Sequence, residues 1–386
     1  MTYDFIIYGN GLSSKLLALA FSRNNFKSLI IADKKPKTKE SNLVTFISEG
    51  SLKYIAKALE TDNLFPESEN IEQLYCEHRV SKKATKLEFK NPNRLSLGKI
   101  VPNAIIDEFF NNKILSNSQY IDISDHYDIT PIIDDNKITI RDRSGEVKSS
   151  GLLFYSASRQ ENDLLHKFEF VEKKLDQVAI SASVNIRRKQ HNLAYQLFTQ
   201  DGPVALLPVQ GNEASVVWSL EKNSSILKLP QNDLENQLNR LFENHVSELK
   251  IKNIQTQKLS FSYAKKMHQD KIVLIGNVAH NIHPIAGQGF NLTVKDISKI
   301  VFYIKKNRSL GLDFNSKQVL ENFNNSRKFD NFAFSFGTLA MENIFSNQNN
   351  FIRYFTSNGL SLVNRSKILK NFFIEKATGK ANFKNY

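Results

Sequence analysis

The most constraining feature of the chain is a glycine-rich run at 276–291, which reads GNVAHNIHPIAGQGFN. The apolar segment before it, 272–275, predicts a buried strand, and a helical pattern begins after it at Leu292. Glycines let backbone N–H groups approach a ligand closely, and a helix N-terminus carries partial positive charge. The run therefore predicts a binding site for an anionic or electron-rich ligand.

A second glycine turn lies near the N-terminus. The apolar segment 5–8 predicts a strand, Gly9 and Gly11 follow, and a helical pattern extends through Ala20. In a dinucleotide-binding fold the first glycine permits the tight turn, and the second lets a pyrophosphate approach the backbone. This part of the chain therefore predicts a nucleotide-binding strand, turn and helix.

The rest of this N-terminal pattern is partly degenerate. A second strand at 29–31 ends close to Asp33, at the spacing expected for an acceptor of ribose hydroxyls. Ser14 stands where the third glycine is expected, and it is small enough for close packing of helix and strand. Taken alone, this motif leaves NAD and FAD both open as ligands.

The run at 276–291 resembles the second flavin-binding motif of the FAD-dependent aromatic hydroxylases, the flavoprotein monooxygenases. It is most similar to the ubiquinone-biosynthesis branch, the 2-polyprenyl-6-methoxyphenol hydroxylase-like proteins. The resemblance selects FAD for the N-terminal motif as well. It implies an α/β fold of the para-hydroxybenzoate hydroxylase type, with a Rossmann-like FAD-binding domain and an inserted antiparallel-sheet substrate domain.

The resemblance also implies roles for individual residues. Asn277 is expected to bond the ribityl chain, and His283, Pro284 and Ile285 are candidates for the flavin face, although no general base can be assigned. The expected cofactor-binding residues are Gly9, Gly11, Ser14, Asp33, Gly276, Asn277, Pro284, Gly287, Gln288, Gly289 and Asn291.

Simpler interpretations exist for some of these residues. Asn277 and Asn291 could be turn residues, and His280 and His283 could be buried histidines with ordinary partners. We expect no metal site at this histidine pair, since no third ligand lies nearby and Pro284 would break the helix that such a pair requires.

Two contacts usual in the family are missing. Leu43 stands where an Arg normally contacts the cofactor. At a third motif, an Ala-Asp-Gly after a strand, Ala157 replaces the Asp and Ser158 replaces the Gly. Either the flavin is held mainly by backbone groups of the two intact motifs, or the protein has a non-catalytic, accessory role.

Composition narrows the class of protein. A chain of 386 residues with 41% hydrophobic residues predicts two domains with sizeable cores. A lone cysteine, Cys76, excludes a disulfide framework and favours a reducing compartment. No apolar run approaches the roughly 18 residues of a membrane span, and we expect no signal peptide because the first residues already predict a strand.

The net charge of +13 has three explanations. Abundant Lys and Asn throughout the chain favour a compositional bias. Attraction to anionic lipid headgroups is the second explanation. Nucleic-acid binding is the least favoured, because no motif for it is found. We expect a cytoplasmic protein, with peripheral association at the inner membrane surface, or within a biosynthetic complex, left open.

The two flavin motifs lie near opposite ends of the chain, so the FAD-binding domain must be assembled from separated segments. We expect it to comprise 1–173 with 255–345, and part of 70–97 could join the substrate domain. The substrate domain is expected at 174–254, where four strand-like runs alternate with turns. After Pro230 a helical stripe is predicted, comprising Leu234, Leu238, Leu241, Phe242 and Leu249. Residues 346–386 form a basic, apolar segment, expected to be helical with a tail.

The function implied by the resemblance is hydroxylation of a polyprenylated phenol in ubiquinone biosynthesis, with NAD(P)H as reductant and O2. Segments 194–199, 202–208 and 217–220 resemble the substrate-domain strands of that branch. The alternative is a flavin-binding accessory protein of the same pathway, and an unrelated flavin oxidoreductase is less favoured. The ring position, the choice between NADH and NADPH, and the oligomeric state are left open.

Overall fold

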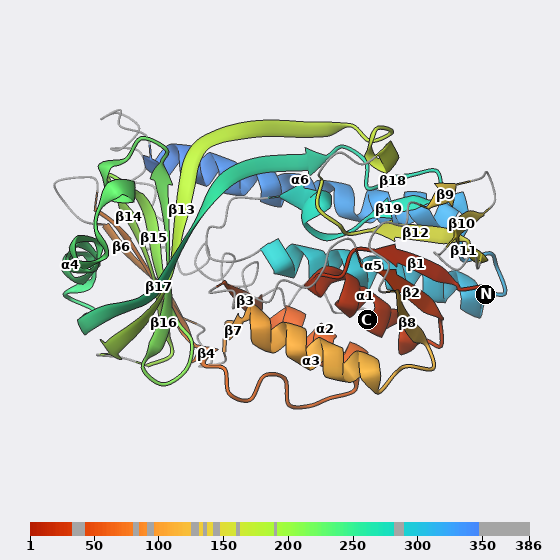
Figure 1. Cartoon of the computed structure of the whole chain (residues 1–386), viewed down its shortest axis with the longest axis horizontal. Helices are drawn as coiled ribbons and strands as arrows, with labels where there is room; N and C mark the ends of the chain where they lie inside the picture. The colour runs from red at the N-terminus through yellow and green to blue at the C-terminus, as the bar shows by residue number, and fades with distance from the viewer. Residues whose placement is uncertain are drawn as a thin grey trace.

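The structure is a computed structural model that describes residues 1–32, 43–79, 85–90, 96–124, 131–133, 137–141, 147–159, 163–188, 191–281 and 289–346. A mostly parallel sheet with its helices occupies one end of the molecule, and an antiparallel sheet occupies the other (Figure 1). Two strands, β13 (Phe170–Arg188) and β17 (Val246–Ala264), run from one end to the other.

The first sheet is parallel except at one edge, where β18 pairs antiparallel with β19. Its central strands read FIIY, SLII and LLFY and are buried almost throughout, as expected for parallel strands covered on both faces. In spatial order the strands are β18 (His268–Gln269), β19 (Ile272–Leu274), β12 (Leu152–Tyr155), β1 (Phe5–Tyr8), β2 (Ser28–Ile31) and β8 (Ile121–Ser124).

Helices cover this sheet and form its core. Helix α1 (Leu12–Ser22) packs against both α3 (Asn103–Leu115) and α5 (Gly289–Ser309), and α5 packs against α6 (Lys317–Ser346). The helix expected from Leu292 thus begins three residues earlier, at Gly289. The amphipathic α2 (Glu49–Leu59) also packs against α5.

Two small antiparallel sheets complete this end of the molecule. The sheet of β3 (Val44–Ser48), β7 (Gly98–Pro102) and β4 (Asn70–Ile71) lies next to α2. The other consists of β11 (Val147–Ser150), β10 (Ile138–Arg141) and β9 (Ile132–Ile133).

The large second sheet has eight strands and is antiparallel except where β14 pairs with β5. The expected domain limits 173/174 and 254/255 fall inside its long strands β13 and β17, and β5 and β6 of segment 70–97 belong to it. Its order is β20 (His280–Asn281), β17, β13, β16 (Glu213–Glu221), β15 (Gly202–Pro208), β14 (Leu193–Thr199), β5 (Gln73–His78) and β6 (Thr85–Lys90).

Helix α4 (Gln231–Phe242) covers one face of the second sheet and packs over the fully buried Trp218. Leu234, Leu238 and Phe242 are buried, as the helical stripe predicted. The assignment of Leu249 to that stripe is wrong, because α4 ends at Phe242 and Leu249 lies in β17. Leu249 appeared to fit because its strand faces the same apolar core.

The core of the parallel sheet contains a cluster of aromatic rings. The rings of Phe5 and Phe21 stack with centroids 4.1 Å apart, and Phe154 contacts both. All three side chains are fully buried. This cluster fixes α1 on the sheet and so determines where the loop after β1 can lie.

Phe154→Ala should lower the free energy of unfolding by about 3–5 kcal/mol, because it leaves a cavity between β12 and α1. Phe329→Ala is the control, since Phe329 on α6 is 77% exposed and its removal should change stability by less than about 0.5 kcal/mol. Urea unfolding of both variants measures the difference, and equal costs would contradict this account of the core.

Candidate functional site

The loops that follow β1, β12 and β19 converge at the carboxyl ends of these parallel strands. Gly9 (φ +119°) is so crowded that a Cβ would lie 2.8 Å from the backbone nitrogen of Ala157. At Gly276 (φ +84°) a Cβ would lie 2.7 Å from Ser13 Oγ and 3.4 Å from Ser156 Oγ. Open α/β sheets bind ligands in the crevice outside the carboxyl ends of their strands, so this convergence is the candidate site.

Helix α1 begins directly after the Gly9 turn and has an open N-terminus. Its N-cap, Gly11, provides no side-chain hydrogen bond, and the first turn contains no acidic residue. A Cβ at Gly11 would meet no atom within 4 Å. The first N–H groups of a helix have no partner inside it and form its positive end, so this terminus suits a pyrophosphate.

The third residue of the N-terminal pattern, Ser14, is completely buried. Its Oγ has no hydrogen-bond partner among the described residues. The next side chain, Lys15, turns to α3, where its Nζ lies 2.5 Å from Asp107 Oδ1. Protein atoms already enclose this Oγ, so the small Ser14 side chain serves the close packing of α1 and offers no open surface to a ligand.

The second motif contributes an exposed amide and a buried one. Asn277 is exposed in the short helix η3 (Gly276–Val278). Asn291 is buried in α5, where its Oδ1 accepts from Ser48 N at 2.8 Å and its Nδ2 donates to the Phe46 carbonyl at 2.7 Å. Asn291 is thus no turn residue, and it ties α5 to β3 beside the candidate site.

Six residues that the sequence assigns to the site lie outside the described part of the chain. They are Asp33, His283, Pro284, Ile285, Gly287 and Gln288. Gly289 is described and is the first residue of α5.

The degenerate third motif lies at the convergence. Ala157 is buried against the Gly9 turn, and the Ser158 carbonyl accepts from Tyr155 Oη at 3.2 Å. The side chain of Arg159 stacks on the Phe170 ring, with the guanidinium 3.7 Å from the ring centroid, and forms an ion pair with Glu172. At the position of the missing cofactor-contacting Arg, Leu43 is partly exposed and precedes β3.

A buried polar network that the sequence analysis missed lies beside the second motif. His280 Nε2 lies 2.5 Å from Asp296 Oδ2, and Arg327 Nε donates to Asp296 Oδ1 at 2.7 Å. All three side chains are at most 1% exposed. His280 is therefore a buried histidine that is paired through Nε2, whereas its buried Nδ1 has no hydrogen-bond partner among the described residues. Single residues on α5 and α6 carry no sequence signal of this pairing, which only the packing of the two helices reveals.

Burial and the neighbouring charges have opposite effects on the pKa of Asp296. Burial alone would raise the pKa of the Asp296 carboxyl, but the nearby Arg327 and His280 hold that pKa below its ordinary value of 3.8. Asp296 is therefore an anion at neutral pH, and it is enclosed between two cationic or hydrogen-bonding partners.

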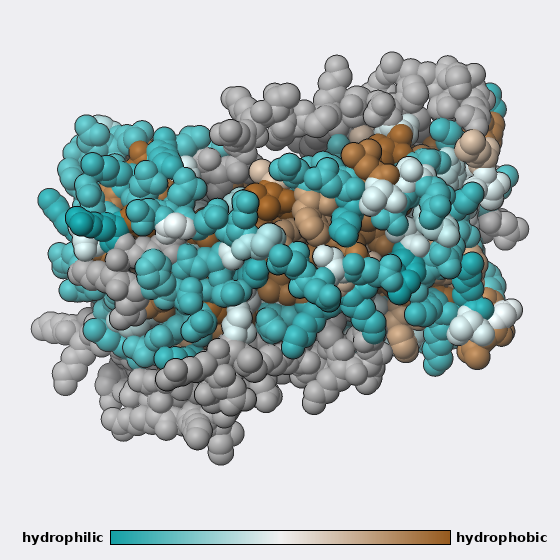
Figure 2. Space-filling model, turned by 90° about the horizontal axis from the view of Figure 1, so that it is seen from below, coloured by the Kyte–Doolittle hydropathy of each residue, from teal (hydrophilic) through white to brown (hydrophobic). Residues whose placement is uncertain are grey.

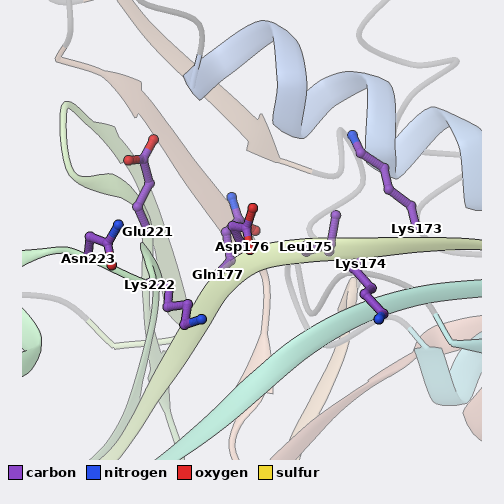
Figure 3. A pocket seen from close by; sticks show the side chains of 8 residues that line it. All are labelled: Lys173, Lys174, Leu175, Asp176, Gln177, Glu221, Lys222 and Asn223. Atoms are coloured by element: carbon purple, nitrogen blue, oxygen red, sulfur yellow. The ribbon is translucent and has the colours of Figure 1, made fainter.

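A separate groove of about 510 Å³ lies at a bulge of β13 (Figure 3). Lys173, Lys174 and Lys222 line it together with Asp176 and Glu221, and no aromatic side chain does. None of the residues assigned to the cofactor lies in it. Charges of both signs at an open surface favour solvation, so we do not assign the groove to the cofactor or an apolar substrate.

Among the residues that the structure describes, no cluster of three or more His, Cys, Asp or Glu side chains could hold a metal ion. No helix in the same part of the chain is long and apolar enough to cross a membrane.

Comparison with known proteins agrees with this geometry. A family model described as an FAD binding domain matches residues 155–306. The ubiquinone hydroxylase UbiL of Rhodospirillum rubrum is 29% identical over 206 residues, which are 53% of this chain and 48% of that protein. In sequence the chain thus resembles the FAD-dependent aromatic hydroxylases. The mitochondrial ubiquinone biosynthesis monooxygenase COQ6 of Dictyostelium discoideum is 22% identical, and the alignment covers 99% of this chain and 92% of that protein.

Solved structures show that the fold is that of flavin monooxygenases. The p-nitrophenol 4-monooxygenase PnpA of Pseudomonas putida superposes with a TM-score of 0.79 at 9% identity, covering 100% of this chain and 99% of that one. An HpxO variant of Klebsiella pneumoniae in complex with FAD gives a TM-score of 0.74 at 13% identity, with 98% of both chains covered. The expected fold class and FAD as cofactor are confirmed. The match to UbiL spans about half the length of that relative.

Gly9→Ala should destabilise the protein by more than Gly211→Ala. Gly211 also has a positive φ of +54°, but a Cβ there would meet no atom within 4 Å. The control should therefore cost only the backbone strain of about 1–2 kcal/mol, whereas Gly9→Ala adds a clash with the backbone of Ala157. Urea unfolding compares the two variants, and a cost no greater at Gly9 would argue against the tight convergence of these loops.

Asp296→Asn should destabilise the protein by about 3–5 kcal/mol at neutral pH, because it leaves the buried Arg327 with only the half-exposed Asp330 as an anionic partner. The pKa of Asp296 is lower in the folded state than in the unfolded state, where it is near 3.8. The Asp296 carboxylate therefore stabilises the fold fully above the unfolded pKa, and this stabilisation is lost as pH falls through the folded pKa. The gap in unfolding free energy between wild type and variant should therefore narrow in acid.

Urea unfolding at pH 7 and at stepwise lower pH, without added FAD, measures this gap. Asp270→Asn is the control, since Asp270 is half-exposed and pairs with Lys167 at the surface, where such pairs contribute about 0–1 kcal/mol. A gap for Asp296→Asn that stays constant with pH would show that the Asp296 charge does not stabilise the fold.

Proposed function

We propose that the chain is an FAD-dependent monooxygenase that hydroxylates the aromatic ring of a polyprenylated phenol in ubiquinone biosynthesis. The observation that carries the proposal is the convergence of the loops after β1, β12 and β19 in a chain whose relatives are named ubiquinone hydroxylase and ubiquinone biosynthesis monooxygenase. In the overall reaction, one atom of O2 enters the ring and the other forms water, and NAD(P)H supplies the two electrons.

The chain would hold FAD mainly through backbone groups. The N-terminus of α1, with Gly9, Gly11 and the small Ser14 that allows close packing, would receive the pyrophosphate, and Asp33 would bind the ribose. The exposed Asn277 amide, which can both donate and accept, would bond the ribityl chain. The remaining proposed contacts are Gly276, Pro284, Gly287, Gln288, Gly289 and Asn291.

Bound FAD would supply the electron storage and oxygen activation that side chains cannot provide. The task of the protein is to bind and orient the ring system, to stabilise negative charge and to exclude water. The N-terminus of α5 at Gly289 is suited to the second task, because its partial positive charge needs no proton. His283, Pro284 and Ile285 remain the proposed lining of the flavin face, with no general base assigned.

The large sheet favours a neutral, apolar substrate. One transverse row on its face opposite α4 runs through Ser181, Val217, Ala205, Gln196 and Cys76, which are cross-strand partners. No member of this row is charged. An aromatic acid would need a cationic partner for its carboxylate, so the row supports a phenol without a carboxylate.

The same face continues into an apolar contact with the FAD-binding end. Ala194, Ala205 and Leu207 of the large sheet pack with Ile100 of β7, and Phe46 of β3 packs against them. Figure 2 shows hydrophobic side chains in the middle of the lower face, between the two ends of the molecule. We propose that an isoprenoid tail lies along the apolar surface beside this contact, with delivery from a membrane surface or a biosynthetic complex at the inner face of the membrane.

We retain the domain division proposed from the sequence, with 1–173 and 255–345 binding FAD and 174–254 forming the substrate domain. The strands β5 and β6 extend the substrate sheet, which supports the inclusion of part of 70–97. Residues 346–386 are proposed as a separate C-terminal segment.

A second candidate function is a flavin-binding accessory protein of the same pathway. Leu43 and Ala157, where relatives of this type carry a cofactor-contacting Arg and Asp, specifically favour it. Such a protein would retain the backbone contacts and lose productive reduction by NAD(P)H. The two functions differ in a single observable, the reduction of bound flavin.

The test is the visible absorption spectrum of the purified protein, with FAD added if necessary, followed by anaerobic NADPH or NADH. Flavin bands that bleach on addition of either nucleotide are the result expected of a monooxygenase. Bound flavin that neither nucleotide reduces would favour the accessory function, and an absence of flavin binding would contradict both.

Gly11→Ala provides the matched variant for this test. It should leave the stability of the FAD-free protein unchanged, because a Cβ there meets no atom within 4 Å. It should weaken FAD binding by about tenfold or more, which corresponds to roughly 1.4 kcal/mol, since the methyl group occupies space that the pyrophosphate needs. Unchanged FAD affinity would contradict the placement of the pyrophosphate at α1.

A further inference from the structure

The His280 network connects three elements that surround the second flavin motif. His280 belongs to β20, Asp296 to α5, and Arg327 and Asn331 to α6. Asn331 Nδ2 donates to Asp296 Oδ1 at 3.1 Å, and its Oδ1 accepts from Arg327 NH2 at 2.6 Å. Asp330, which is half-exposed, accepts from Arg327 NH1 at 2.8 Å and is the outermost charge of the network.

The second flavin motif, 276–291, is described at 276–281 and at 289–291, and the network connects these two parts. The short helix η3, with Gly276 and Asn277, ends two residues before His280, and η3 itself packs against α5. Asp296 lies on α5 two turns after Gly289. The bond from His280 to Asp296 therefore sets the distance between η3 and the N-terminal half of α5.

The network also joins this site to the substrate sheet. His280 pairs with Tyr263 across β20 and β17, and β17 continues into the eight-stranded sheet. A displacement of β20 would therefore change the positions of η3 and of β17 together.

Apolar packing would stabilise these elements at least as well as buried charges. Replacing a buried ion pair by hydrocarbon is often neutral or stabilising, because desolvation of the charges is costly. Hydrogen bonds, unlike apolar contacts, hold their atoms within narrow limits of distance and angle. What this network contributes, and apolar packing would not, is therefore a fixed relative position of β20, α5 and α6.

We propose that His280, Asp296, Arg327 and Asn331 are positioning residues that set the spacing between η3 and α5, and thereby the affinity and reduction potential of bound FAD. The inference rests on the proposed FAD contacts at Gly276, Asn277 and Gly289. None of the four positioning residues needs to touch the cofactor. The alternative is a network that only stabilises the fold.

The experiment compares His280→Gln with His268→Gln in the full-length protein. His268 is a matched control, because it is also buried, at 3% exposure, and lies 3.6 Å from an acid, Glu321 on α6, but it belongs to β18 at the edge of the parallel sheet. Three quantities are measured for each variant: the Kd for FAD by quenching of flavin fluorescence, the midpoint potential of bound FAD, and the melting temperature without FAD.

His280→Gln should raise the Kd for FAD by about tenfold, as expected for the loss of a coupling of this kind, and should shift the midpoint potential. His268→Gln should change the Kd by less than about twofold, whatever its effect on the melting temperature. If both variants melt lower but bind FAD with equal Kd and potential, the network is purely structural and the proposal is overturned.

Asn331→Ser provides the same test with less risk to folding. It removes one donor to Asp296 and one acceptor for Arg327, but it leaves the ion pair between Asp296 and Arg327 in place. It should raise the Kd for FAD by a smaller factor than His280→Gln, and a Kd equal to that of His268→Gln overturns the proposal. If the wild type binds no FAD, the proposed FAD site is itself wrong. If the wild type binds FAD and the network variants bind it equally well, only the positioning role is wrong.

Discussion

The close backbone approach at the carboxyl ends of β1, β12 and β19 is the constraint on which the rest of the structure depends. Gly9 and Gly276 have positive φ angles, and a side chain at either would collide with the loop or helix opposite. These glycines let the N-terminal and second flavin motifs meet, although a whole substrate domain separates them in the chain. The order of the strands and the position of the inserted domain both follow from that requirement.

The inserted domain is held to this site by strands rather than by a flexible connection. Both β13 and β17 run for 19 residues and pair with each other along most of that length. The last pairs of β17 bring β20, and with it His280, into the large sheet. The face of the sheet that could receive a substrate and the helix that follows the flavin motif are therefore parts of one hydrogen-bonded structure.

The sequence predicted the features that depend on local backbone chemistry. The glycine runs that begin at Gly9 and Gly276, with apolar strands before them, carried the resemblance to the FAD-dependent aromatic hydroxylases, and that resemblance implied the fold class. The partners of His280 could not be predicted, since Asp296 and Arg327 look like ordinary polar residues of amphipathic helices. Leu249 was misassigned for a related reason, because a strand and a helix that share one core both carry buried leucines. The sequence alone does not show which residues far apart in the chain contact one another.

The missing charges of the family pattern change the physical character of the cofactor site. With Leu43 and Ala157 in place of an Arg and an Asp, the described part of the proposed site depends on helix N-termini and backbone N–H groups for its positive potential. Such groups do not titrate and are fixed by the fold. The strength of cofactor binding then depends on how accurately α1 and α5 are placed. A buried network that holds α5 at a fixed distance from η3 is consistent with that dependence, because backbone groups, unlike flexible charged side chains, cannot adjust to a displaced helix.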